Sequence, residues 1–123
     1  MKPYRGFADL LHQRRTACDL TLQQLADKLE MSRQYLSELE RGAKSPPPER
    51  HLRRMAEVLS VDFEMLRREA ELSRPEVTID VRHLPLTHRQ AALAVAQRFA
   101  EGLTDADVHA LLTWAGQHQE VAS

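Results

Sequence analysis

The chain has 123 residues, a formal net charge of −1 and one cysteine. This length suits one or two small domains and excludes most multi-domain enzymes. No apolar run approaches the roughly 20 residues that span a bilayer, and the amino terminus does not resemble a signal peptide. We therefore expect a soluble cytoplasmic protein with no membrane partner. Cys18 has no partner for an internal disulfide, and we expect it to be a small packing residue.

The near-neutral total charge hides a difference between the two halves of the chain. Residues 1–60 contain 11 Lys and Arg against 8 Asp and Glu, which gives +3, whereas residues 61–123 contain 6 against 10, which gives −4. A locally positive surface favours contact with nucleic acid. Because the excess is small, we expect weak nonspecific binding and a dependence on base contacts and on dimerisation.

The first half of the chain predicts five helices. The first covers residues 7–17, and residues 21–41 predict two short helices joined by a tight turn at Glu30 and Met31. Thr21 with Gln24 forms a capping-box pattern, and Ser32 is placed to cap the next helix. Helix four is expected over residues 48–59, with Pro48 in its first turn, and helix five over residues 63–72. The apolar positions that give residues 21–41 their helical periodicity are Leu22, Leu25, Ala26, Leu29, Leu36 and Leu39.

Residues 7–62 resemble the Cro/CI-type (XRE) helix-turn-helix family, whose DNA-binding domain is of the lambda repressor type. The likeness lies in residues 20–26, 32–36, 39–42 and 46–48 and in the pattern Leu52-x-x-Met55-Ala56-x-x-Leu59. The resemblance implies a five-helix DNA-binding domain over residues 1–72, with its recognition helix over residues 32–41. It also implies double-stranded DNA as the partner.

The start of the recognition helix reaches base edges in this family. Arg33 can bind guanine O6 and N7, Gln34 can pair with adenine, and Glu38 can accept from a cytosine amino group. A solvated helix face is the alternative interpretation, and Tyr35 could equally lean on the preceding helix. The predicted base-contacting residues are Ser32, Arg33, Gln34, Ser37 and Glu38. The predicted phosphate-contacting residues are Thr21, Gln23, Tyr35, Arg41 and Lys44.

One position departs from the pattern of some family members, because Leu22 stands where they have glutamine. Arg14 and Arg15, at the end of the first helix, could contact the DNA backbone or form a solvated helix end.

The second half predicts a dimerisation region over residues 73–123. Residues 77–81 alternate in the manner of a strand, and a lone strand needs a partner such as a second copy of the chain. A helix over residues 87–100, opened by a capping box of Thr87 and Gln90, is apolar on more than one side, so we expect a neighbour to bury it. A last helix is expected over residues 105–116. The predicted dimerisation residues are Val77, Ile79, Val81, Phe99, Leu111 and Trp114.

The chain shows no sign of an enzyme. Its six histidines are scattered without metal-ligand spacing, and it has neither a Gly-rich phosphate loop nor a serine elbow, so we expect no catalytic residue, metal or cofactor. The sequence thus predicts an all-α regulator, a five-helix domain followed by a short strand and two helices, which represses transcription by binding a palindromic operator as a homodimer.

Two alternatives stay open. The first is an antitoxin-like protein whose carboxy-terminal half binds a protein partner and which regulates its own operon. The second is a regulator that responds to a small-molecule ligand. The second half of the chain is short and leaves little room for a ligand pocket, so this alternative ranks last.

Overall fold

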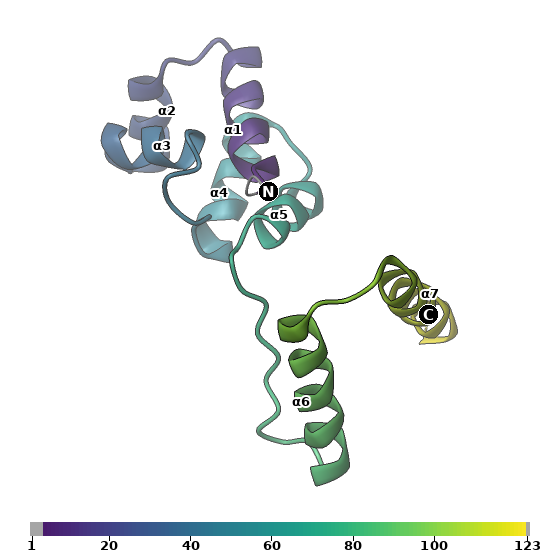
Figure 1. Ribbon diagram of the computed structural model, residues 1–123. Coiled ribbons are helices and arrows are strands. Elements are labelled where there is room, and N and C mark those ends of the chain that lie inside the picture. The colour runs from purple at the N-terminus through teal and green to yellow at the C-terminus, as the bar shows by residue number, and fades with distance from the viewer. Residues whose placement is uncertain (1–3, 123) are drawn as a thin grey trace. The chain divides into compact units, whose positions relative to one another are not determined.

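A computed structural model describes residues 4–122, apart from the side chains of residues 117–122, and assigns only helices within that range (Figure 1). The chain divides into two compact units, Met1–Val77 and Thr78–Ser123. None of the described helices is long and apolar enough to cross a membrane. The helices are α1 Gly6–Ala17, α2 Leu22–Leu29, α3 Arg33–Glu40, α4 Glu49–Leu59, α5 Phe63–Leu72, α6 Leu86–Glu101 and α7 Asp105–Ala122.

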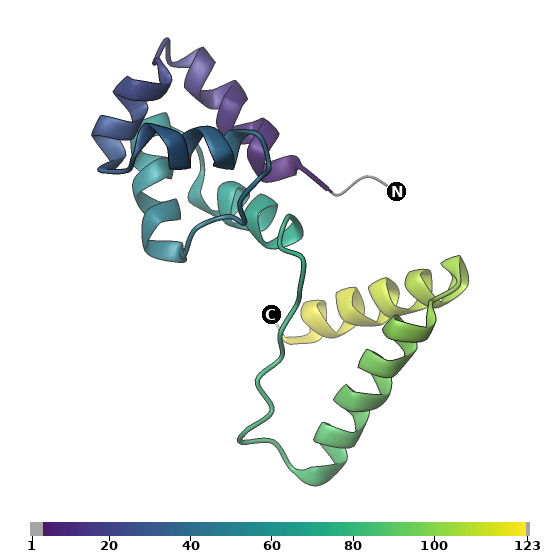
Figure 2. The same cartoon turned by 60° about the vertical axis from the view of Figure 1, so that its left-hand side comes forward.

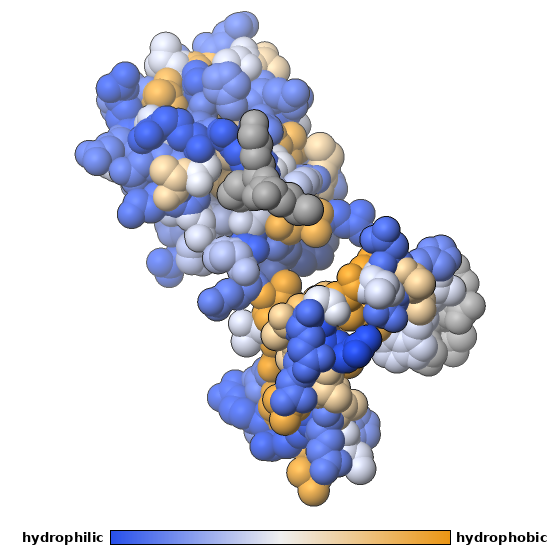
Figure 3. All heavy atoms as spheres, viewed as in Figure 1, coloured by the Kyte–Doolittle hydropathy of each residue, from blue (hydrophilic) through white to orange (hydrophobic). Residues whose placement is uncertain are grey.

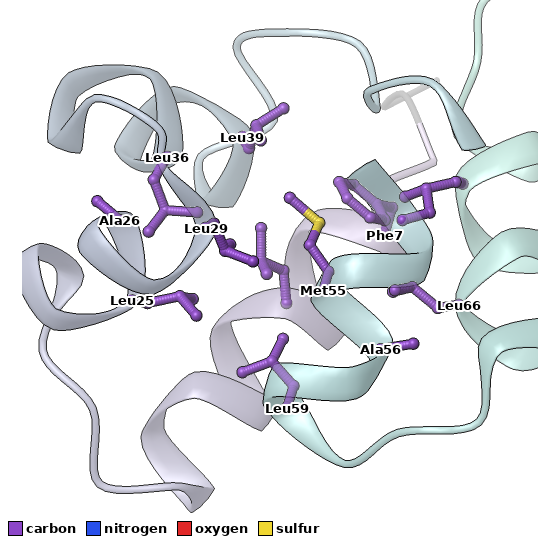
Figure 4. Packing of buried hydrophobic residues seen from close by; sticks show 13 residues of the cluster. Phe7, Leu25, Ala26, Leu29, Leu36, Leu39, Met55, Ala56, Leu59 and Leu66 are labelled. Carbon is purple, nitrogen blue, oxygen red and sulfur yellow. The ribbon is translucent and has the colours of Figure 1, made fainter. Parts of the chain in front are cut away.

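The first unit is a bundle of five helices around one apolar cluster. Figure 4 shows how the buried side chains of this cluster pack. Helix α1 packs against α3 and α5, α2 packs against α3 and α4, and α4 packs against α5. Burial of a leucine side chain contributes roughly 1.5–3 kcal/mol, so this cluster is the main stabilising element of the unit. Each helix supplies at least one fully buried leucine, namely Leu11, Leu25, Leu36, Leu59 and Leu66.

The predicted caps of the helix pair are confirmed. The Gln24 N–H donates to Thr21 Oγ1 at 3.1 Å, and the Thr21 N–H donates to Gln24 Oε1 at 2.9 Å. The Tyr35 N–H donates to Ser32 Oγ at 3.1 Å and so fixes the start of α3. Between them, Glu30 ends α2 with a left-handed backbone, at φ 56°. Asp19 and Ser60 adopt the same conformation in the turns after α1 and α4.

The prediction for Pro48 is wrong in detail. This residue lies just outside α4 as its N-cap, in an extended conformation with ψ 163°. Extended ψ is common at an N-cap, and the absent proline N–H costs nothing there. Arg74, just after α5, fixes the loop before α4, because its guanidinium donates to the carbonyls of Pro46 at 2.9 Å and Pro47 at 3.0 Å.

The strand predicted over residues 77–81 is wrong. No strand is assigned to any described residue, and Val77 and Ile79 are largely exposed. The alternating, β-branched composition favours extended backbone, but a strand also requires ladder hydrogen bonds to a neighbour. No other segment of the described chain supplies one.

Helices α6 and α7 start by different means. The capping box predicted at Thr87 and Gln90 is wrong, because α6 begins one residue earlier, after Pro85, and Thr87 lies inside its first turn. The predicted cap of α7 is confirmed: the Asp107 N–H donates to Thr104 Oγ1 at 3.1 Å, and the Thr104 N–H donates to Asp107 Oδ2 at 3.2 Å. Helix α7 continues to Ala122, beyond the predicted end at residue 116.

The second unit leaves many of its large apolar side chains exposed. Helices α6 and α7 diverge from the short loop that joins them (Figure 2), and no residue of α6 is buried. The expectation that a neighbour buries α6 is therefore wrong within the single chain. Figure 3 shows apolar residues gathered on this unit, whereas the visible face of the first unit is mostly hydrophilic.

Candidate nucleic-acid interface

Helix α3 has one buried and one exposed face. Leu36 and Leu39 are fully buried on the inner face, which fixes the rotation of the helix about its own axis. On the outer face Ser32, Arg33 and Gln34 are exposed. The Arg33 side chain makes no hydrogen bond or ion pair to another residue of the described chain. Its guanidinium is therefore available to a ligand.

The remaining predicted base-contacting residues interact within the helix. Gln34 Nε2 donates to Glu38 Oε1 at 3.4 Å, and Arg41 Nε donates to Ser37 Oγ at 3.4 Å. Ser37 and Glu38 are only half-exposed. Both hydrogen bonds are long and lie at the surface of the domain, so an incoming base edge could replace them at little cost.

The predicted phosphate-contacting residues flank α3. Thr21 and Gln23 lie at the start of α2, where Thr21 is engaged in its capping box and Gln23 Nε2 donates to Asp27 Oδ1 at 2.8 Å. Arg41 and Lys44 are exposed in the turn after α3. Tyr35 is half-buried and packs against the core.

Leu22 also packs against the core, so it offers a phosphate no polar side chain. Any contact at the start of α2 must come from the neighbouring residues.

An ion pair that the sequence analysis missed fixes the end of α3. Arg15 Nε of α1 lies 2.7 Å from Glu40 Oε2, and His12 Nδ1 lies 2.8 Å from Glu40 Oε1. Arg15 Nη1 also donates to the Leu20 carbonyl at 2.8 Å. Arg14 donates to the Leu59 carbonyl at 3.2 Å. Both arginines at the end of α1 are therefore used within the domain and do not form a solvated helix end.

The predicted dimerisation residues of the second unit differ in exposure. Val77, Ile79, Phe99 and Trp114 are exposed, whereas Val81 and Leu111 are half-buried. Phe99 and Leu111 line an open, mostly apolar hollow of about 370 Å³ between α6 and α7. Arg98 and Asp107, whose side chains lie 3.5 Å apart, form its polar rim.

The described residues contain no group of three or more His, Cys, Asp or Glu side chains that could hold a metal ion. In the second unit, Asp107 takes part in the cap at the start of α7. The Thr104 N–H and hydroxyl, both bound to this carboxyl, lower the pKa of Asp107 below its ordinary value of 3.8.

The geometry of α2 and α3, with buried leucines on one face and polar side chains on the other, agrees with the family comparison. Residues 11–66 match the family model described as helix-turn-helix. This segment is therefore a helix-turn-helix domain of the Cro/CI type, as the sequence predicted. The chain thus carries a helix-turn-helix domain, a type of domain that binds DNA in transcription regulators.

One solved structure, described as a SinR protein/SinI protein complex, aligns with 93% of this chain and 98% of its own, with 20% sequence identity and a TM-score of 0.46. No curated protein sequence matches the chain.

Proposed function

We propose that this protein is a sequence-specific transcriptional repressor that binds an inverted repeat in double-stranded DNA as a homodimer. The observation that carries the proposal is the exposed polar face of α3, with an unpaired Arg33, inside the segment that matches the helix-turn-helix family model. Leu36 and Leu39 anchor the opposite face of the helix in the core.

The mechanism is steric. Helix α3 enters the major groove, where Arg33 and Gln34 in its first turn reach base edges. Each bidentate contact discriminates between bases by roughly 1–3 kcal/mol. Thr21, Gln23, Arg41 and Lys44 contact phosphates on either side and set the register of the helix. A protein bound across a promoter in this way blocks access of the transcription machinery.

Dimerisation is supported by the uncovered apolar side chains of the second unit. Leu93, Phe99 and Leu112 are each about 60–70% exposed, which is costly for a single chain in water. The hollow between α6 and α7 can take an apolar helix, and a second copy of the chain supplies one. A two-fold symmetric pairing buries the same residues on both copies. Two recognition helices then read half-sites roughly 34 Å apart, one turn of DNA.

A second candidate function rests on the same hollow. An antitoxin-like protein would use α6 and α7 to bind a different protein and would regulate its own operon through α3. The excess of acidic over basic residues in 61–123 favours a basic partner. This candidate predicts a chain that is monomeric or aggregated until its partner is added.

The test is selection of bound sequences from a randomised duplex library, followed by native mass spectrometry of the complex. Enrichment of a two-fold symmetric site occupied by two chains supports the repressor. Enrichment of a single, asymmetric half-site bound by one chain contradicts the proposed homodimer but still supports sequence-specific DNA binding. No enrichment at all rejects the function.

A further inference from the structure

The turn that follows α3 is unusually well fixed for an exposed segment. The Ala43 N–H donates to the Glu38 carbonyl at 2.9 Å, and the Gly42 N–H donates to the Leu39 carbonyl at 3.2 Å. Together with the positive φ of Gly42, 73°, these bonds form a Schellman motif. The backbone that carries Arg41 and Lys44 is therefore held in one conformation.

Arg5, from the segment just before α1, lies against this turn. Its Nη2 donates to the Glu40 carbonyl at 3.5 Å. A Cβ placed on Gly42 would lie 3.3 Å from Arg5 Nε, so the guanidinium passes directly over the glycine. Arg5 and Arg41 line the same two surface hollows, and Lys44 lines one of them. Three cationic side chains from two distant segments thus meet at the end of α3.

The carboxylates near this cluster leave it positively charged. Glu40 is already paired with Arg15 and His12. Among the residues that line the two hollows, Asp9 is the only other carboxylate in the described chain. Three like charges at one site repel each other, and an anion relieves that repulsion. The long bond to the Glu40 carbonyl engages one N–H of Arg5, and a guanidinium has five.

We infer that Arg5, Arg41 and Lys44 form a phosphate-binding cluster and that Arg5 is a DNA-contacting residue. The inference rests on the proposed function, because the phosphate is that of the DNA backbone beside the groove that α3 enters. Leu22 lines one of the same hollows and offers no polar group. The cations therefore supply the backbone contact on this side of the recognition helix.

The test compares the salt dependence of DNA binding for the unmodified chain, Arg5→Gln and Arg68→Gln, on the duplex enriched from the library. Arg68 is exposed on α5 and has no ion pair among the described residues, so its substitution matches the loss of charge at a site outside the cluster. Each phosphate contact contributes about 0.9 to the slope of log affinity against log salt. We expect Arg5→Gln to lower the slope by about that amount and Arg68→Gln to leave it unchanged.

Arg5 could instead serve only to cap α3. In that case Arg5→Gln lowers the thermal midpoint and leaves the slope unchanged, which overturns the inference. If the variant does not fold, the unmodified chain can be tested instead. Phenylglyoxal modifies accessible arginine side chains, and peptide mass spectrometry then identifies which of them have reacted. The duplex should protect Arg5 and not Arg68, and equal modification of Arg5 with and without DNA also overturns the inference. If the unmodified chain binds no duplex, the proposed function itself fails.

Discussion

Arg15 and Glu40 join α1 to the end of the recognition helix through an ion pair that is nearly buried. The Nε–Oε2 distance is 2.7 Å, and the two side chains are 13% and 6% exposed. His12 approaches the same carboxylate from the solvent side and is 57% exposed. Because Glu40 is the last residue of α3, this pair attaches the end of the recognition helix to α1.

Removal of one partner of this pair should destabilise the first unit. Glu40→Gln leaves the Arg15 guanidinium with no anionic partner in a nearly buried site, and we expect a loss of roughly 3 kcal/mol in the free energy of unfolding. Urea denaturation followed by circular dichroism measures it. Glu57→Gln, at an exposed site on α4, is the matched control and should leave the midpoint unchanged. Equal midpoints for the two variants would show that the pair contributes nothing.

Arg33 and Lys44 should affect DNA binding in different ways. Arg33→Ala removes a base contact, and we expect a loss of roughly 1–3 kcal/mol on the preferred site together with a relaxed preference at one base pair. Lys44→Gln should weaken binding to all sequences alike and reduce the salt slope by about 1. Binding isotherms on the selected duplex and on single-base variants separate the two roles. Identical behaviour of the two variants contradicts both assignments.

The turn after α3 should not tolerate a side chain at Gly42. Its φ of 73° disfavours L-residues, and a Cβ would meet Arg5 at 3.3 Å. We expect Gly42→Ala to cost about 1–2 kcal/mol in unfolding free energy. Gly116→Ala should instead raise the unfolding free energy. This helical glycine has open space around it, and alanine favours the helix. Thermal unfolding of both variants checks the prediction.

The start of α7 should depend on pH through Asp107. The folded state lowers the pKa of this carboxyl, so its contribution to stability is present above the ordinary value of 3.8 and is lost as the pH falls through the lower folded value. In acid, we expect the amide signals of Thr104 and Asp107 to shift as the capping box opens, as NMR titration would record. Asp107→Asn should abolish this transition, whereas Asp105→Asn should retain it. A transition that persists in Asp107→Asn assigns it to another group.

The apolar hollow between α6 and α7 should control the oligomeric state. Phe99→Asp places a charge on its wall, and we expect the dimer to dissociate into monomers in sedimentation velocity experiments, with weaker binding to the symmetric site. Met65→Asp adds the same charge to an exposed apolar residue of α5 and should leave the dimer unchanged. A Phe99→Asp variant that remains dimeric would place the dimer interface elsewhere.

Much of the first unit could be predicted because its signals are short-range. The caps at Thr21 and Ser32 require only residues three positions apart, and helical periodicity identifies Leu25, Leu36 and Leu39 as core. These features depend on local backbone geometry, so they can be predicted without knowledge of the rest of the fold.

The place of Pro48 and the cap at Thr87 were errors about local structure. The other errors concern interactions that the local pattern does not contain. Arg15 and Glu40 are 25 positions apart, and no periodicity connects them. Residues 77–81 have the composition of a strand but no partner in the described chain, and α6 lacks the neighbour that its apolar sides predict. The residues that the structure adds to the candidate site, Arg5 foremost, also lie far along the chain from α3.

The left-handed backbone of Asp19, Glu30 and Ser60 leaves room to engineer a more stable protein. A left-handed conformation costs an L-residue roughly 1–2 kcal/mol, and glycine avoids that cost while losing about 0.5–1 kcal/mol through the greater freedom of the unfolded chain. All three residues are exposed and lie in the turns that follow α1, α2 and α4. Glycine at these positions should thus raise heat tolerance by several degrees without altering the core or the face of α3 that reads DNA.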